Sequence, residues 1–151
     1  MRVFHSTIVI VLALGSASPS SGLGLAWNDD SGIHRSLGSD PLISPVLFET
    51  FETRGIAVDP TNAELWWSEI LPLGAPLPGG VIRTGRTKGG AITDVVTHLA
   101  SPAGVALDAR RGRIYWSDLG DVNNASAIFS ANLDGSDVQK LVSQLRMRAG
   151  R

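Results

Sequence analysis

Short runs in which large apolar residues alternate with small or polar residues fill most of the chain, and turn residues separate them. In 55–59 and 104–108, "GIAVD" and "GVALD", the large side chains point to one side of an extended strand, while glycine and alanine point to the other. In 64–69 and 113–118, "ELWWSE" and "RIYWSD", bulky residues point to both sides, so burial on both faces is expected. No long segment has a helical pattern. The chain is therefore predicted to be all-β, with short antiparallel strands.

These strands belong to a repeat. Residues 54–69 align without a gap with residues 103–118, which lie 49 positions later. An incomplete earlier copy contains "LAWND", in which Trp27 lies forty positions before Trp67. Four strands in every ~40–50 residues are typical of a β-propeller blade, so about three blades are predicted. The blade repeats span about 25–48, 54–97 and 103–143, and a next blade begins at 144–151.

The motifs of these repeats resemble a known family. "LWWSE" and "IYWSD", each preceded by G-[IV]-A-[VL]-D, and "ANLDGSD" after the second are similar to the low-density lipoprotein receptor class B repeat, also called the YWTD repeat. The second copy departs from that motif at Trp66 and Glu69. The resemblance implies a six-bladed propeller of an extracellular protein that binds protein ligands. Structural roles, in packing or in turns, are expected for the repeated residues Trp27, Asp29, Asp59, Trp67, Glu69, Asp108, Tyr115, Trp116 and Asp118.

The N-terminus, "MRVFHSTIVIVLALGSAS", has the pattern of a secretory signal peptide. Arg2 precedes an apolar run over 8–14, and small residues follow it, which predicts a signal peptide at 1–17 and a partial β-propeller at 18–151. A membrane anchor is the alternative, but the run is much shorter than the ~20 residues that span a bilayer. We therefore expect a secreted product, or a periplasmic one if the source is bacterial. The chain has no cysteine, so hydrophobic burial rather than disulfides must stabilise it.

The repeat register continues to the C-terminus, where "LRMRAGR" aligns with "LASPAGV" 46 positions earlier. At the other end the first copy is expected to lack an inner strand, because the place of that strand falls on Gly15, inside the signal peptide. Three blades cannot close a ring. We expect a fragment or a truncated product of a longer six-bladed protein, with self-association through its open blade edges.

Two groups of residues are candidates for binding. Asp59 and Asp108 end the inner strands near the central channel, where a ring of carboxylates could hold calcium; the alternative is that each bonds the turn that follows it. No other cofactor is predicted. Asn124 begins a glycosylation sequon. The irregular, apolar loop at 69–80 could recognise a partner or simply pack. Its candidate binding residues are Ile70, Leu71, Leu73 and Leu77.

The charge of the chain and its sequence motifs limit the classes of function that are expected. Thirteen basic and fourteen acidic residues give a net charge of −1 without a basic cluster, so no nucleic acid partner is expected. His34 and His98 do not occur in a nucleophile or zinc motif, and no catalytic residue is predicted. We expect an exported, non-catalytic propeller that binds a protein or glycan. The alternative is a propeller enzyme of the lactonase or lyase type with a polar or metal site in the central channel.

Overall fold

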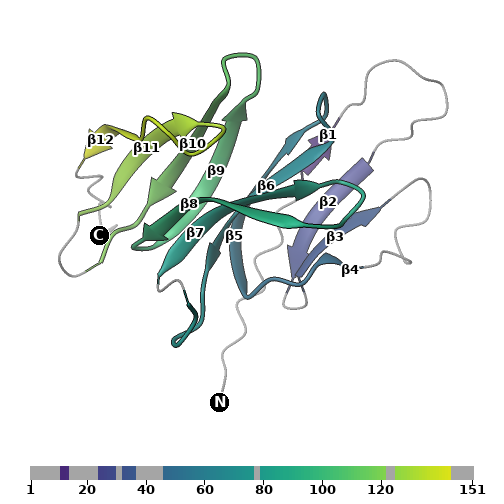
Figure 1. The fold of residues 1–151 in the computed structure, drawn as a ribbon, viewed down its shortest axis with the longest axis horizontal. Helices are drawn as coiled ribbons and strands as arrows, with labels where there is room; N and C mark the ends of the chain where they lie inside the picture. The colour runs from purple at the N-terminus through teal and green to yellow at the C-terminus, as the bar shows by residue number, and fades with distance from the viewer. Residues whose placement is uncertain are drawn as a thin grey trace, which may run out of the picture.

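Antiparallel β-strands form the protein (Figure 1). The described ranges contain twelve strands in three four-stranded sheets, and within them no helix is long and apolar enough to cross a membrane. This confirms the predicted all-β fold with four-stranded antiparallel blades, three of which are present. The computed structural model describes residues 11–13, 24–29, 32–36, 46–76, 79–121 and 125–143.

Each predicted blade is one sheet, and its strands pair in chain order. The first blade consists of β1 (Val11–Ala13), β2 (Gly24–Asp29), β3 (Gly32–Ser36) and β4 (Val46–Phe48). The second blade consists of β5 (Glu52–Asp59), β6 (Glu64–Ile70), β7 (Gly80–Arg86) and β8 (Ile92–Leu99). The third blade consists of β9 (Pro102–Asp108), β10 (Arg113–Asp118), β11 (Ala127–Asn132) and β12 (Gln139–Ser143).

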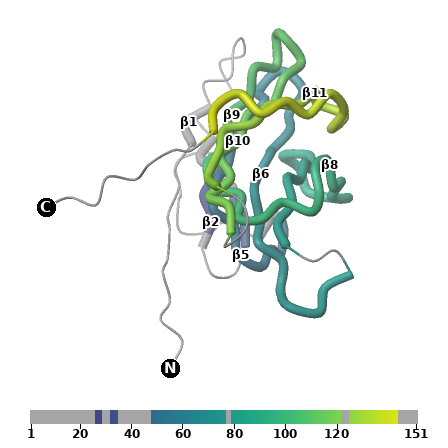
Figure 2. Tube along the Cα trace, turned by 90° about the vertical axis from the view of Figure 1, so that its left-hand side faces the viewer, coloured from purple at the N-terminus to yellow at the C-terminus, as the bar shows by residue number. Residues whose placement is uncertain are grey.

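The blades lie side by side, with the second between the first and the third (Figure 1). Figure 2 shows the inner strands β5 and β9 on one side of the molecule and the outer part of the second blade, β8, on the other. The same order of inner and outer strands is expected when blades are arranged around a common axis.

Two apolar cores fill the spaces between neighbouring blades. Between the first and second blades, Trp67 is fully buried and stacks on Phe48, with ring centroids 5.0 Å apart. Between the second and third blades, Trp66 and Trp116 are both buried in one apolar cluster. The alternation in the sequence explains this arrangement, because each blade presents its larger residues to the preceding blade and its smaller residues to the next. Other members of the two cores are Ala26, Ile33, Ile56 and Leu65 in the first, and Ala57, Ile82, Val96, Ile114 and Ala131 in the second.

Glycine and serine bring the inner strands of the second and third blades together. A Cβ atom on Gly55 would lie 2.5 Å from the carbonyl oxygen of Ala103 and 2.9 Å from the amide nitrogen of Val105. Ser68 Oγ donates a hydrogen bond to the same Ala103 carbonyl. The small residues of the repeat therefore allow the main chain of the next blade to approach.

In the full-length chain the first blade has an inner strand, β1, so the first copy lacks one only if residues 1–17 are removed as predicted. β1 pairs antiparallel with β2, with Leu12 opposite Leu25, and it lies six positions earlier than the forty-residue spacing predicts. Pairing satisfies backbone groups that the edge of β2 would otherwise leave without partners. β1 lies inside 1–17, and cleavage of that segment as a signal peptide remains a prediction.

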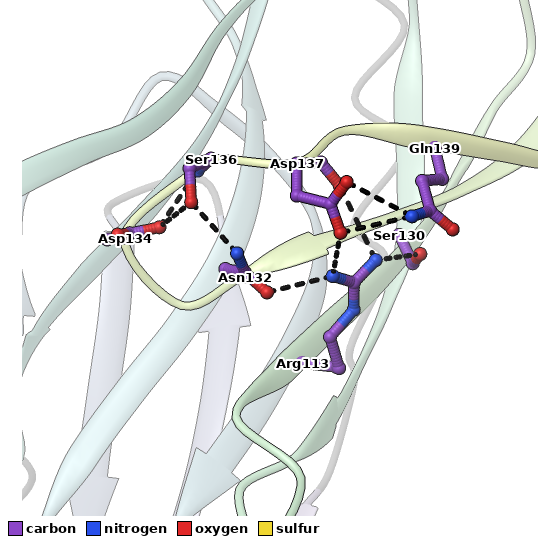
Figure 3. A network of polar contacts seen from close by, with 7 residues as sticks. All are labelled: Arg113, Ser130, Asn132, Asp134, Ser136, Asp137 and Gln139. Atoms are coloured by element: carbon purple, nitrogen blue, oxygen red, sulfur yellow. Dashed lines mark hydrogen bonds and ion pairs between the residues drawn. The ribbon is translucent and has the colours of Figure 1, made fainter.

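A polar network centred on Arg113 holds the turn between β11 and β12 (Figure 3). The guanidinium donates to Asp137 at 2.7 Å, to Asn132 Oδ1 at 2.8 Å and to Ser130 Oγ at 2.7 Å. Hydrogen bonds from Gln139 and then from Arg113 lower the pKa of Asp137 below its ordinary value. The network joins three strands of the third blade and fixes the position of the turn.

Gly135, in the turn between β11 and β12, lies against the second blade. Its φ is +82°, and a Cβ atom would lie 2.1 Å from the carbonyl oxygen of Val95. We expect Gly135→Ala to lower the free energy of unfolding by about 2–4 kcal/mol, through left-handed strain and overpacking. Gly112→Ala is the control, since Gly112 has a φ of +64° but open space around it, and should cost only about 1–2 kcal/mol. Urea denaturation followed by circular dichroism compares them; equal losses would show that the contact with Val95 does not require glycine.

Candidate functional site

In the second and third blades, an acidic residue at the end of the second strand accepts hydrogen bonds from the backbone that leads into the inner strand of the same blade. Glu69 Oε1 accepts a hydrogen bond from the Phe51 amide at 2.7 Å. Asp118 accepts from the amides of Ala100 at 3.1 Å and Ser101 at 2.8 Å, and from Gly120 at 2.9 Å. Both acids therefore fix the backbone at the same edge of their blades. We call this edge, where β5, β7 and β9 begin, the loop rim.

Glu69 has a further role that its extra methylene group makes possible. Its Oε2 atom accepts from Trp67 Nε1 at 3.2 Å and from Arg83 Nη1 at 2.9 Å. Burial acts to lower the pKa of Arg83, but the hydrogen bond and charge of Asp94, together with Glu69, outweigh it and raise that pKa. Its contacts with Trp67 and Arg83 thus explain why glutamate stands here in place of the aspartate of the motif.

The residue opposite each motif tryptophan differs between the blades. Trp67 pairs across the strands with Arg83, and Trp116 pairs with Phe129, on which it stacks with ring centroids 5.6 Å apart. Trp27 is partly exposed and stacks on His34 at 5.4 Å. Glutamate therefore accompanies arginine in the second blade, whereas aspartate accompanies phenylalanine in the third. The side chain of Asp29 lies outside the described part of the structure.

Both candidate calcium ligands bond the turns that follow them, at the edge opposite the loop rim. Asp59 is buried and accepts from the amides of Thr61 and Asn62 at 2.9 and 3.1 Å. Asp108 accepts from the side chain and the amide of Arg111, and these two hydrogen bonds lower its pKa below the ordinary value. Within the described ranges, no three His, Asp or Glu side chains come together as a group that could hold a metal ion.

Exposed apolar side chains gather on the loop rim. Leu73 is fully exposed, at 107%, while Ile70 and Leu71 are half-buried. The Leu71 amide donates to the Gly79 carbonyl at 2.9 Å, which closes the base of the loop. Leu77 and Asn124 lie outside the described residues. The structure thus leaves Leu73 as the exposed tip of an anchored loop.

Two more apolar residues of the loop rim were not predicted from the sequence. Phe51 is 60% exposed just before β5, and Leu119 is 47% exposed just after β10. The Leu119 amide donates to the Ser101 carbonyl, which places it beside the start of β9. Each residue flanks a strand of the repeat, which places it at an edge of a blade, but the sequence carries no signal that it is exposed.

A hollow of about 270 Å³ lies on the same rim in the third blade. Lys140 lies over the ring of Phe129, with Nζ 5.4 Å from the ring centroid, and His98 and Asp118 also line the hollow. Because the Asp118 carboxylate already accepts three backbone amides, the hollow offers mainly an aromatic ring and two basic side chains. The hollow therefore adds an aromatic and basic surface to the exposed apolar residues of the loop rim.

These observations define the protein as a β-propeller, of which the described residues form three blades. No family model matches the chain. It is similar to Protein cueball of Drosophila grimshawi, with 36% identity over 88 residues, which are 58% of this chain and 14% of that protein. The chain thus spans only a small part of this curated relative.

A solved structure described as "Crystal structure of Nidogen/Laminin Complex" is similar in fold. It matches with a TM-score of 0.70 and 21% sequence identity, covering 93% of this chain and 49% of that chain. The chain therefore corresponds in length to about half of a solved propeller chain.

Proposed function

We propose that this chain is part of an exported, non-catalytic propeller of the YWTD type, and that it binds a protein partner through the loop rim. The observation that carries the proposal is the full exposure of Leu73 at the tip of a loop whose base is held by hydrogen bonds. Exposed apolar residues on a rigid scaffold are typical of recognition surfaces.

The comparisons support a protein as the partner. The solved structure that is similar in fold is a complex between two proteins, nidogen and laminin. Motifs of the YWTD type and the predicted signal peptide support an extracellular place of action. The bonds that Asp59 and Asp108 make to their own turns give no support to the enzymatic alternative.

Laminin is the first probe, because it is one of the two proteins in that complex. We expect immobilised full-length chain to bind laminin in biolayer interferometry, and Leu73→Asp to weaken binding at least about tenfold, since a charge would replace an apolar anchor. Val138→Asp is the matched control, because Val138 is 51% exposed in the turn between β11 and β12, away from the loop rim.

Two results would count against this proposal. Equal binding by the Leu73→Asp and Val138→Asp variants would show that the loop rim is not the contact surface. Binding to a glycan array without binding to laminin would show that the partner is a glycan and not a protein.

A further inference from the structure

The third blade has an unpaired cation where the second blade has a closed set of ion pairs. In the second blade, Arg83 pairs with Asp94 at 2.6 Å and with Glu69 at 2.9 Å. The repeat places an aromatic ring at the position of Arg83 and Lys140 at the position of Asp94. Lys140 has no carboxylate partner among the residues that the structure describes. The third blade therefore has a positive charge that its own acids do not match.

The ammonium group of Lys140 is held over that aromatic ring. Its Nζ atom lies 5.4 Å from the ring centroid of Phe129, which stands opposite Lys140 in the sheet. Phe129 in turn stacks on the buried ring of Trp116, with centroids 5.6 Å apart. Because a cation is attracted to the face of an aromatic ring, this contact limits the positions that the exposed lysine takes. The positive charge thus has a defined place on the loop rim.

The hollow of about 270 Å³ lies beside this cation, where the third blade meets the second. His98 and Leu99 of β8 line it from the second blade, and Phe129 and Lys140 line it from the third. Asp118 also lines the hollow, but its oxygens accept three backbone amides, which offset its charge. The volume is slightly below the ~300–1,000 Å³ of pockets for small ligands. The hollow therefore suits one side chain better than a whole small molecule.

His98 has a strained backbone at this hollow. Its φ of +60° lies in the left-handed region, and residues held in that region are concentrated at ligand sites. The side chain is exposed, and Nδ1 lies 2.9 Å from Thr97 Oγ1. When the hydroxyl group donates to Nδ1, the ring carries its hydrogen on Nε2 and can donate it to an oxygen atom of a ligand. His98 thus adds a hydrogen-bond donor to the charge of Lys140.

We propose that this hollow binds the carboxylate of a glutamate or aspartate side chain of the protein partner, an inference that rests on the proposed function. The carboxylate pairs with Lys140, as Glu69 and Asp94 pair with Arg83 inside the second blade. Leu119 is 47% exposed and stands between two residues that line the hollow. An apolar residue next to the acid in the partner therefore finds an apolar contact.

A peptide titration tests the hollow without laminin. The probes are acetyl-Leu-Glu-Leu-amide and the same peptide with glutamine in place of glutamate. In nitrogen-15 NMR spectra of the full 151-residue chain, we expect the glutamate peptide to shift the amide signals of His98 and Lys140. Its dissociation constant should be about fivefold lower than that of the glutamine peptide, the difference expected of one accessible ion pair.

Two lysine variants show whether the preference comes from the hollow. Lys140→Met keeps an apolar stem over Phe129 but removes the charge, so the chain should bind both peptides equally. Lys88→Met is the matched control, because Lys88 is the other lysine of the chain and is exposed in the turn between β7 and β8, at the edge opposite the loop rim. It should keep the preference of the wild type.

His98→Gly separates binding from stability. Glycine relieves the left-handed strain, so the melting temperature should rise by about 2–4 °C, while loss of the imidazole donor should raise the dissociation constant of the glutamate peptide about threefold. Thermal unfolding and the same titration measure the two effects. An unchanged dissociation constant would show that the imidazole ring does not contact the carboxylate.

Laminin binding shows whether the hollow belongs to the surface that contacts the partner. We expect Lys140→Glu to weaken binding about tenfold in biolayer interferometry, because two carboxylates would face each other, and Lys88→Glu to bind like the wild type.

The outcomes distinguish this inference from the proposed function. If Leu73→Asp weakens laminin binding but Lys140→Glu does not, the inference is overturned and the proposed function stands. If laminin does not bind but the chain still prefers the glutamate peptide, the proposed function is contradicted and the carboxylate site is supported. Equal affinity for the two peptides would overturn the inference, and so would binding of a hyaluronan hexasaccharide in place of the glutamate peptide.

Discussion

Replacing Trp67 by alanine should lower the free energy of unfolding by about 3–5 kcal/mol. The side chain is 0% exposed, stacks on Phe48 of the first blade and donates to Glu69, so its removal leaves a cavity between two blades. The loss would be read from urea denaturation followed by far-ultraviolet circular dichroism, with the change in m value as a check that the two-state treatment holds.

Trp27 provides the matched control, because it occupies the same position in the first blade but is partly exposed. Trp27→Ala, measured at a protein concentration low enough to keep the chain monomeric, should cost no more than about 1–2 kcal/mol, since less apolar surface is buried. A loss as large as that of Trp67→Ala would show that burial between blades is not what makes the motif tryptophan stabilising.

Glu69→Ala is the second substitution with a large expected effect, about 3–5 kcal/mol. The carboxylate is nearly fully buried and accepts from Phe51, Trp67 and Arg83. Its removal leaves two donors without an acceptor and leaves the mostly buried guanidinium of Arg83 with Asp94 as its remaining ionic partner. Thermal and urea denaturation of the variant would measure the loss.

Glu69→Asp separates the contributions of this carboxylate. The shorter side chain should keep the bond to the Phe51 amide, as Asp118 keeps the equivalent bonds in the third blade, but should lose Trp67 Nε1 and so cost about 1–2 kcal/mol. Trp116 Nε1 in the third blade is buried and has no hydrogen-bond acceptor among the described residues. If the alanine and aspartate variants lost the same free energy of unfolding, the bond to the Phe51 amide would not contribute separately from the bond to Trp67.

The repeat made much of the fold predictable. The alternation of Gly55, Ile56, Ala57 and Val58 shows which side of an inner strand is small, and the same alternation 49 positions later gives the blade register. The turn bonds of Asp59 were also foreseeable, because an aspartate followed by "PTN" forms its contacts within three residues. The repeat period and the hydrogen bonds that aspartate forms with neighbouring residues are sufficient to predict these features.

Features that depend on pairing across loops were not predictable in the same way. The contact between Glu69 and Arg83 requires the register of β6 and β7, and an irregular loop separates these strands. β1 was not expected because the repeat spacing places this strand at Gly15, inside the predicted signal peptide. Its connection to β2 is also six residues longer than the equivalent connection in the second blade. Phe51 and Leu119 are single apolar residues beside the ends of strands, and a sequence does not show whether such residues are exposed.

The contact between the second and third blades affects how many amino-acid substitutions the interface between blades can tolerate. Gly55 and Ser68 meet the main chain of β9, and a carbonyl oxygen is the same whichever residue carries it. The neighbour can therefore exchange most of its side chains without losing the fit, provided that its backbone keeps its path. A contact of this kind tolerates wide sequence change, which agrees with a fold shared with a solved propeller at a TM-score of 0.70 and 21% identity.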